Sequence, residues 1–299
     1  MTHPSGKKTG YKIDTIYTIL IGVFITLICG IMLYPFLFTI SASISNPDTV
    51  VRNQVTFFPK GPVNLEAYKI LFKNNRIWTG YANTIFYTAF GTLINLIITI
   101  LAAYPMSRSR FNGYKFINIF VSITMFISAT GMMIPLFLVV KSLHLLDTRF
   151  AILIVFAAFP YYIILLRSFF QGLPEQMFEA ARLDGASEFT ILVKIVLPLS
   201  GAALATIGLY YGINRWNGYF WAMIFLRDEA KHPLQVVLRE LIVLASMGEE
   251  MDANLSRSAT NAEAIKYGAI VLATLPIAII YPFIQKYFVK GATLGSVKG

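Results

Sequence analysis

The chain has 299 residues, of which 56% are hydrophobic and 13% charged, and its formal net charge is +10. This composition excludes an ordinary soluble globular protein, in which about 25% of the residues are charged. The basic excess does not indicate a nucleic-acid-binding protein, because the Lys and Arg residues are spread over many segments and form no basic, aromatic-interleaved patch. The sequence therefore predicts a membrane protein.

Charged residues divide the chain into six long uncharged runs. A helix needs about 20 apolar residues to cross a bilayer, and each run reaches or approaches that length. We therefore predict an all-α, polytopic membrane protein, with residues 1–299 forming a single transmembrane domain of six helices. The predicted spans are residues 16–40, 81–105, 116–140, 150–168, 199–226 and 266–287. Pro198 should start the fifth span, because its missing N–H falls in the first turn of a helix.

The first run does not read as a cleavable signal peptide. Lys7, Lys8 and Lys12 precede it, but it is too long for a signal core and no small-residue cleavage site closes it. The single cysteine, Cys29, lies inside this run, so no disulfide framework is possible within the chain. Basic residues close to the membrane ends favour a cytoplasmic amino terminus, although Lys and Arg as a whole are balanced between the two sides.

The segment between the first two runs combines turn signals with a short apolar pattern. Asn46-Pro47-Asp48 and Pro59-Lys60-Gly61-Pro62 are typical of turns. The apolar positions between Leu65 and Phe72 predict a short helix lying at the membrane surface.

Residues 169–198 form a polar island that is much longer than a simple connection requires. Within it, Glu175–Leu183 has the composition of a short helix, and Asp184-Gly185 supplies a helix stop. Adjacent alanines let a partner approach closely, and Glu179 and Arg182 share one helix face. The segment therefore predicts a docking helix whose candidate contact residues are Glu179, Ala180, Ala181, Arg182, Asp184 and Gly185.

The fifth run carries the strongest signal for a solute pathway. Aromatic rings pack against the C–H faces of sugars, and amides and guanidinium groups hydrogen-bond hydroxyls and carboxylates. For the tyrosines an interfacial aromatic belt is an equal alternative. A lipid-facing Arg215 would cost about 2.5–3.5 kcal/mol, so Arg215 should face a cavity or an acidic partner. The candidate pathway residues are Tyr210, Tyr211, Asn214, Arg215, Trp216 and Asn217.

The chain lacks the residues that ion coupling, nucleotide binding and metal binding usually require. No carboxylate lies within the six runs, which disfavours an ion-coupled secondary transporter. No Gly-x-x-x-x-Gly-Lys-Ser/Thr phosphate loop occurs, and His3, His144 and His232 are isolated from one another and from cysteine. We therefore predict no catalytic residue, no cofactor and no metal site, and we expect the energy for transport to come from another subunit.

The polar island also matches a family pattern over 20 residues. Glu179-Ala180-Ala181, Gly185, Ile195 and Leu197-Pro198 keep the spacing of the EAA loop, and the segment resembles that loop in permease subunits of ATP-binding-cassette (ABC) importers. The sequence of this segment most resembles the carbohydrate-uptake branch that includes the maltose transporter's second permease. The chain resembles in particular a subgroup that serves complex oligosaccharides.

The resemblance extends to other segments of the chain. Asn83-Thr84, Ile134-Pro135, Trp216-Asn217 and the glycine-rich end Gly291–Gly299 are similar to family segments. Two residues depart from the pattern at a predicted outer turn, because His144 stands where Gly is usual and Asp147 where Asn is usual. These departures concern the local geometry of that turn and not the family.

The resemblance implies a type I ABC importer permease fold and a non-enzymatic subunit. Its partners would be a second homologous permease, an ATPase dimer that docks on residues 169–198, an extracytoplasmic solute-binding protein and a sugar substrate. The protein would lie in the bacterial inner membrane with both termini cytoplasmic, and the tail, residues 288–299, would contact the ATPase without forming a stable helix. Two alternatives remain, a permease of the same architecture for polyamines or organic anions and a free-standing secondary transporter.

Overall fold

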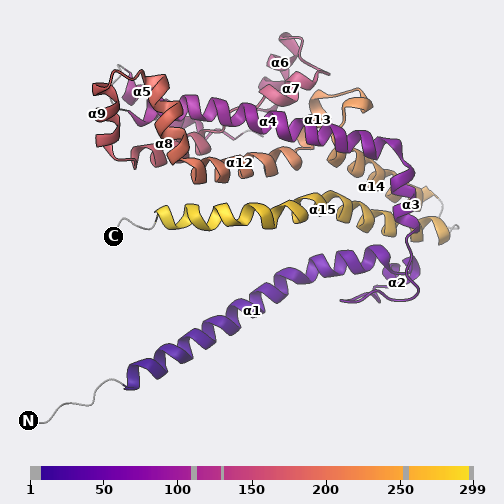
Figure 1. Ribbon diagram of the computed structural model, residues 1–299. Helices are drawn as coiled ribbons and strands as arrows, with labels where there is room; N and C mark the ends of the chain where they lie inside the picture. Colours follow the sequence, from indigo (N-terminus) through magenta and orange to yellow (C-terminus); the bar gives the residue numbers. More distant parts are fainter. Residues whose placement is uncertain (1–7, 109–112, 129–130, 252–255, 296–299) are drawn as a thin grey trace, which may run out of the picture. The chain divides into compact units, whose positions relative to one another are not determined.

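A computed structural model describes residues 8–108, 113–128, 131–251 and 256–295 (Figure 1). Every regular element in these residues is a helix, which confirms the all-α prediction. The chain divides into two compact units, which are described separately. The first unit comprises Met1–Lys73 and Leu241–Leu272, and the second comprises Asn74–Glu240 and Ala273–Gly299.

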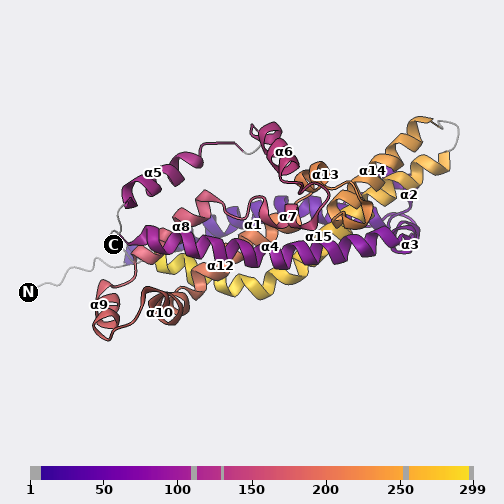
Figure 2. The same cartoon turned by 90° about the horizontal axis from the view of Figure 1, so that it is seen from above.

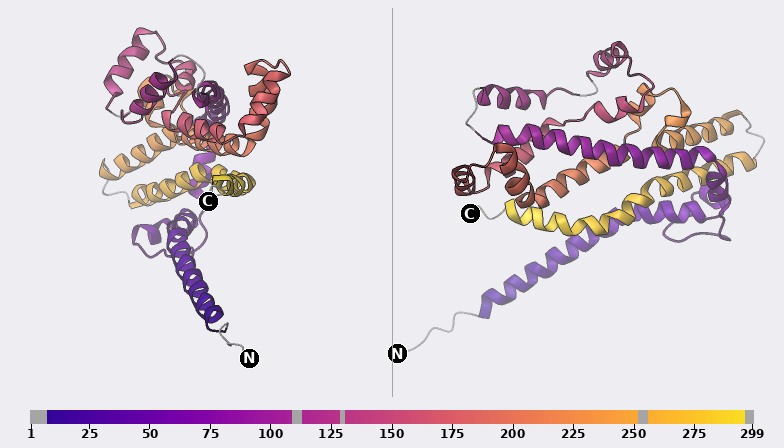
Figure 3. Two further views of the ribbon diagram at one scale, coloured as in Figure 1. Left: turned by 90° about the vertical axis from the view of Figure 1, so that its left-hand side faces the viewer. Right: turned by 45° about the horizontal axis from the view of Figure 1, so that its top comes forward.

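The first unit contains α1 (Lys8–Ile44), a single continuous helix that is plain in both views of Figure 3. Its apolar part, Tyr17–Ile44, is long enough to cross a membrane. Asn46 caps α2 (Pro47–Val51), because its side chain accepts the N–H of Asp48 at 3.0 Å. The Asn-Pro-Asp signal thus starts a helix. α3 (Glu66–Lys73) forms where the apolar pattern predicts a short helix.

The second unit is organised around α4 (Asn75–Ser107), which packs against α12 (Gly201–Trp216) and α8 (Pro160–Gln171). Figure 2 shows α9 (Glu175–Leu183) and α10 (Glu188–Ile191) at one end of α4, and α13 (Phe220–Phe225) farther along it. The core where these helices meet is apolar and fully buried at Leu166, Phe170, Phe178, Ile191, Val196, Ile207 and Tyr211.

Three of the predicted spans are interrupted. The third run forms α5 (Tyr114–Thr124) and α6 (Met133–Ser142), and the fourth forms α7 (Arg149–Ile154) and α8. Pro160 begins α8, since a proline ring has no N–H to continue the preceding helix. The fifth run divides between α12 and α13 around Gly218.

By length and composition, three continuous helices in the described residues qualify as membrane spans. They are Tyr17–Ile44, Asn75–Ser107 and Ala262–Pro282. A fourth candidate is the pair Glu188–Leu199 and Gly201–Trp216, whose two parts are bent by 83°.

This bend corrects the expected place of Pro198, which was predicted to begin the fifth span. Pro198 instead lies in α11 (Leu197–Leu199), which follows the π-helical turn Leu192–Val196, and the long helix α12 begins after the bend at Gly201. The second unit also contains a 3₁₀ turn, Glu229–Lys231.

The last two helices are α14 (Leu234–Met251) and α15 (Ser256–Gly295). The tail was expected to be too glycine-rich for a stable helix, but α15 continues through Gly291 to Gly295. Residues 296–299 of the predicted tail lie outside the described residues.

Candidate functional site

The predicted docking helix forms with the predicted bounds, as α9. Its carboxyl end closes in a Schellman motif, in which the N–H of Ala186 donates to the carbonyl of Ala181 at 2.9 Å and that of Gly185 donates to Arg182 at 3.0 Å. Gly185 has a φ of +77°, a conformation that side-chain-bearing residues rarely adopt. The prediction of a helix stop at this glycine is therefore confirmed.

The inner face of α9 is fixed to the core by packing and charge. The Phe178 side chain is 0% exposed, and the Arg108 guanidinium lies 3.5 Å from the centre of its ring. Arg108 also donates to the Glu175 carboxylate at 2.9 Å and to the carbonyl of Phe170 at 3.0 Å. A single arginine at the end of α4 thus joins α4, α8 and α9.

A second set of contacts joins α9 to α10. Arg182 Nε donates to Glu188 Oε1 at 3.0 Å, and Arg182 Nη1 lies 3.6 Å from Glu175 Oε1. The Tyr104 hydroxyl, on α4, donates to Glu188 Oε2 at 2.5 Å. Glu188 therefore receives bonds from both α4 and α9, which restrains the relative movement of these elements.

The six candidate contact residues divide between two faces of this segment. Ala181 is buried and Arg182 is turned toward Glu188, so these two positions serve contacts within the chain. The exposed surface includes Leu183, whose side chain is 89% exposed, next to the end of the helix. The other four candidates, Glu179, Ala180, Asp184 and Gly185, are exposed.

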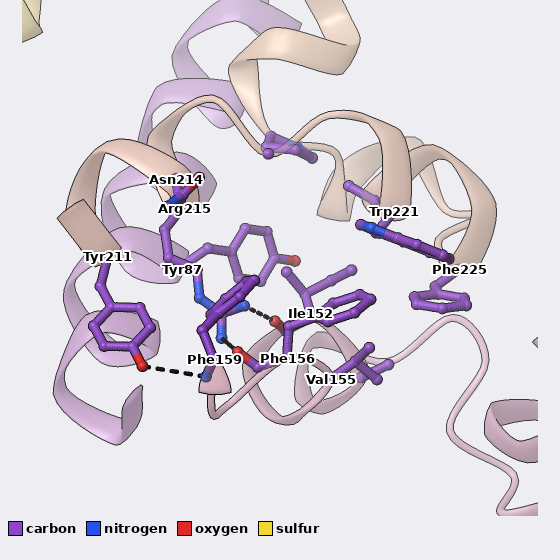
Figure 4. A pocket seen from close by; sticks show the side chains of 14 residues that line it. Tyr87, Ile152, Val155, Phe156, Phe159, Tyr211, Asn214, Arg215, Trp221 and Phe225 are labelled. Carbon is purple, nitrogen blue, oxygen red and sulfur yellow. Dashed lines mark hydrogen bonds between the residues drawn. The ribbon is translucent and has the colours of Figure 1, made fainter. Parts of the chain in front are cut away.

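A cavity of about 280 Å³ lies farther along α4, between α7, α12 and α13 (Figure 4). Aromatic rings make up much of its lining, and Phe156 packs on Trp221 with ring centres 5.0 Å apart. Three of the six candidate pathway residues, Tyr211, Asn214 and Arg215, line this cavity. The other main lining residues are Tyr87, Ile152, Val155, Phe156, Phe159, Trp221 and Phe225.

Arg215 makes its hydrogen bonds to neutral oxygen atoms of its own chain. Nη2 donates to Asn95 Oδ1 at 2.7 Å and to the carbonyl of Leu153 at 3.0 Å, and Nε donates to Asn95 Oδ1 at 3.1 Å. Nη1 donates to the carbonyl of Ile152. The amide and backbone dipoles offset the cost of removing the guanidinium cation from water inside a span. No carboxylate is among its acceptors in the described residues.

Tyr211 and the three remaining pathway candidates contact neighbouring elements or end α12. The Tyr211 hydroxyl is 2.6 Å from Thr99 Oγ1, and Trp216 Nε1 donates to the carbonyl of Ala273 at 3.1 Å. Tyr210 stacks on Tyr162 with ring centres 5.8 Å apart. Asn217 is exposed and caps the carboxyl end of α12. Tyr210, Trp216 and Asn217 are not among the residues that line the cavity.

Asn95 and Thr99, which are both fully buried on α4, were not predicted from the sequence. Asn95 bonds Arg215, and Thr99 bonds Tyr211. The available signal was an amide in the middle of an uncharged run, since a polar side chain inside a span requires a partner.

The pair Asn83-Thr84 also receives a structural role, near the other end of α4. Asn83 Nδ2 donates to the carbonyls of Ala230 at 2.8 Å and His232 at 3.1 Å, and Thr84 Oγ1 accepts the N–H of Leu234 at 2.8 Å. These bonds fix the segment between α13 and α14 to α4.

The two departures from the family pattern lie at special backbone positions. His144 has a φ of +54° and Asp147 a φ of +58°. The N–H groups of Asp228 and Arg227 donate to the Asp147 carboxylate at 3.0 and 3.1 Å and hold the pKa of Asp147 below its usual range. Asp147 thus compensates its backbone strain with hydrogen bonds.

Among the described residues, no group of three or more His, Cys, Asp and Glu side chains is placed to hold a metal ion. An all-helical membrane protein with an exposed polar helix at one end of α4 and an aromatic cavity farther along it has the build of a transport subunit.

The family comparison makes this class specific. The chain belongs to the family described as "binding-protein-dependent transport system inner membrane component", whose model matches residues 95–293. It is therefore a multi-pass inner-membrane permease of an ABC importer, and the family's role is transport. An importer of this kind works with an ATPase and a substrate-binding protein.

Individual relatives match over almost the whole chain. The polygalacturonan/rhamnogalacturonan transport system permease protein YtcP of Bacillus subtilis is 39% identical over 96% of this chain and 99% of its own length. The arabinooligosaccharides permease AraQ of the same species is 28% identical over 95% of this chain and 97% of its own. A crystal structure of a bacterial ABC transporter involved in the import of the acidic polysaccharide alginate matches with a TM-score of 0.79 and 40% identity, over 96% of this chain and 100% of the other.

Proposed function

We propose that the chain pairs with a second homologous permease to form the pathway for an acidic oligosaccharide. A solute-binding protein delivers the sugar, and ATP hydrolysis on an ATPase dimer drives its entry. In this arrangement α9 faces the cytoplasm and both termini are cytoplasmic. The names of the relatives support a saccharide. The permease YtcP, at 39% identity, is named for polygalacturonan/rhamnogalacturonan, and the matched crystal structure, at 40%, is of a transporter involved in alginate import, whereas the arabinooligosaccharide relatives are 28–29% identical.

The observation that carries the proposal is the charge and lining of the cavity. Its aromatic rings are suited to the C–H faces of a sugar. Arg215 borders the same space, and its described hydrogen-bond acceptors are neutral oxygen atoms, so its positive charge attracts an anionic solute. A charge surrounded by low-dielectric protein acts more strongly on such a solute than one in water. The cavity therefore favours a sugar that carries carboxylates.

The second part of the proposal concerns α9. An element that transmits the closing of an ATPase must be rigid on its inner side and exposed on its outer side. The contacts of Arg108 and Glu188 supply the first property, and the exposure of Glu179, Ala180 and Leu183 supplies the second. We assign the contact with the ATPase to this outer face.

The test is uptake by the complete transporter in proteoliposomes. We expect oligogalacturonate to be taken up in preference to a maltooligosaccharide of equal length. Trp221→Ala should lower this uptake, whereas Trp78→Ala, on an exposed part of α4 outside the cavity, should not. Equal uptake of both sugars would contradict the acidic specificity. Uptake of a polyamine or a small organic anion in place of both sugars would overturn the saccharide assignment.

A further inference from the structure

The break between α7 and α8 leaves backbone groups that need partners inside a predicted span. The last carbonyls of a helix lack intrahelical donors, and an unsatisfied group in the hydrocarbon region costs several kcal/mol. Two of the four carbonyls are satisfied locally, because Val155 N–H donates to Ala151 at 3.1 Å and Ala157 N–H donates to Ile154 at 3.0 Å. The carbonyls of Ile152 and Leu153 remain.

Side chains from α4 and α12 satisfy these remaining groups. Arg215 donates to the carbonyls of Ile152 and Leu153, and Asn95 Nδ2 donates to the carbonyl of Phe156 at 2.9 Å. Asn95 Oδ1 in turn accepts two bonds from Arg215. We call this arrangement the Asn95–Arg215 clamp. It caps the carboxyl end of α7 with one guanidinium and one amide.

A parallel contact holds the other side of the break. The N–H of Phe159, the residue that precedes α8, donates to the Tyr211 hydroxyl at 3.3 Å, and that hydroxyl is bonded to Thr99. Thr99 lies one turn after Asn95 on α4, and Tyr211 lies one turn before Arg215 on α12. Side chains from two successive turns of α4 and α12 therefore hydrogen-bond the break between α7 and α8.

The clamp has little freedom to move. A Cβ atom on Gly91, one turn before Asn95, would lie 2.8 Å from Arg215 Nε, so the glycine makes the room for the guanidinium. Phe156 has a φ of +60°, which is rare for a bulky residue and requires its surroundings to hold it. Figure 4 shows Phe156 and Phe159 beside the Arg215 side chain at the cavity.

We propose that Asn95 and Arg215 are positioning residues for transport, because their clamp fixes the broken span and so places the aromatic lining of the cavity. This inference rests on the proposed function, in which the cavity takes the sugar. Asn95 has no place in the lining itself, so its effect on the solute must pass through the clamp. Removing its side chain should therefore disturb the break first and sugar handling second.

The test compares Asn95→Ala with wild type in the complete transporter. Hydrogen exchange followed by mass spectrometry should show the amides of residues 149–160, Pro160 excepted, exchanging about tenfold faster, because hydrogen bonds to a charged group are among the strongest in proteins. Amides of α9 should exchange as in wild type. The oligogalacturonate concentration that gives half-maximal uptake should rise severalfold, while maximal uptake changes less.

Two further variants keep the result interpretable. Asn95→Asp retains an acceptor for Arg215 and should partly restore slow exchange. Asn118→Ala removes another buried amide, one that donates to the carbonyl of Tyr114 at 2.8 Å within its own helix, and should leave residues 149–160 unchanged.

The outcomes separate this proposal from the proposed function. Unchanged exchange at residues 149–160 in Asn95→Ala would overturn the clamp, whatever happens to uptake. Faster exchange with normal half-saturation would overturn its positioning role in transport. If Trp221→Ala leaves sugar uptake unchanged, the cavity assignment itself fails, and the clamp then has no site to position.

Discussion

Arginine side chains beside α4 are hydrogen-bonded in two different ways. At the end of the helix, Arg108 and Arg182 pair with glutamates. Farther along, Arg215 bonds the Asn95 amide and the carbonyls of a broken helix. A carboxylate inside a span is costly, whereas an interrupted helix already has carbonyls in need of donors. The carbonyls at a helix break and a partly buried arginine can therefore satisfy each other's hydrogen-bonding needs without an ion pair.

Gly185→Val should have the largest effect, because it disrupts the end of α9 and with it the proposed contact with the ATPase. A β-branched residue is poorly tolerated at a φ of +77°, so the Schellman end of α9 should be lost. We expect sugar uptake to fall to background, with the ATPase either unbound or hydrolysing ATP without transport. Gly201→Ala is the matched control, since an added Cβ there meets nothing within 4 Å. Normal uptake by Gly185→Val would exclude a coupling role for this turn.

Arg215→Leu tests the Asn95–Arg215 clamp. It leaves the carbonyls of Ile152 and Leu153 without donors, at about 1–3 kcal/mol for each buried group. We expect recovery of the assembled transporter to fall severalfold, with faster hydrogen exchange at residues 149–160. Arg215→Lys, which keeps the charge with fewer donors, should be intermediate. If the assembled transporter is fully recovered and hydrogen exchange at residues 149–160 is as in wild type, while only the preference for acidic sugars is lost, then Arg215 contacts the solute and does not stabilise the helix break.

Arg108→Leu should affect coupling more than folding. It removes the bonds to Glu175 and to the carbonyl of Phe170 and the contact with the Phe178 ring. A charge-assisted hydrogen bond contributes about 1.5–3 kcal/mol. We therefore expect ATP hydrolysed per sugar transported to rise severalfold, measured in proteoliposomes, with near-normal membrane insertion. Lys141→Leu, at an exposed position on α6 outside residues 169–198, is the control. An unchanged ratio would show that α9 does not depend on this anchor.

These two regions also differ in how far the sequence could predict them. The bounds of α9 and the turn at Gly185 follow from a local pattern of charge, alanine and glycine, and both are confirmed. The clamp joins Asn95 to Arg215 across 120 positions, and it exists only because the fourth run is broken. Pro160 signalled that break, but an uncharged run is equally typical of one continuous span.

The corrections at Pro198 and at Gly291 have the same origin. A proline is compatible with the first turn of a helix, so the local sequence could not tell a long span from a three-residue helix before a bend of 83°. Glycines weaken an isolated helix, but α15 extends to Gly295 as the continuation of a 40-residue helix. The cavity lining likewise depends on packing between distant elements, and the sequence predicted only its members on α12.

Substitutions at the turn that contains His144 and Asp147, outside both regions, should change the stability of the protein only slightly. His144 has a φ of +54° and is exposed, so His144→Gly should relieve strain and raise Tm by about 1–3 °C. Asp147→Gly should have the opposite sign, because it loses the bonds to the N–H groups of Arg227 and Asp228. Thermal unfolding of the purified protein checks both, and uptake should stay near normal for His144→Gly. A lower Tm in His144→Gly would contradict the strain assignment.

Cross-linking is the direct test of the proposed contact between the exposed side of α9 and the ATPase. Leu183→Cys, in a Cys29→Ser background, places a single thiol at the end of α9. A short maleimide–succinimidyl ester reagent applied to membranes should join this position to the ATPase, whereas the same reagent at Tyr161→Cys, exposed on α8, should not. We expect an adduct with the combined mass of the permease and one ATPase subunit. An actively transporting complex that gives no such adduct from position 183 would contradict it.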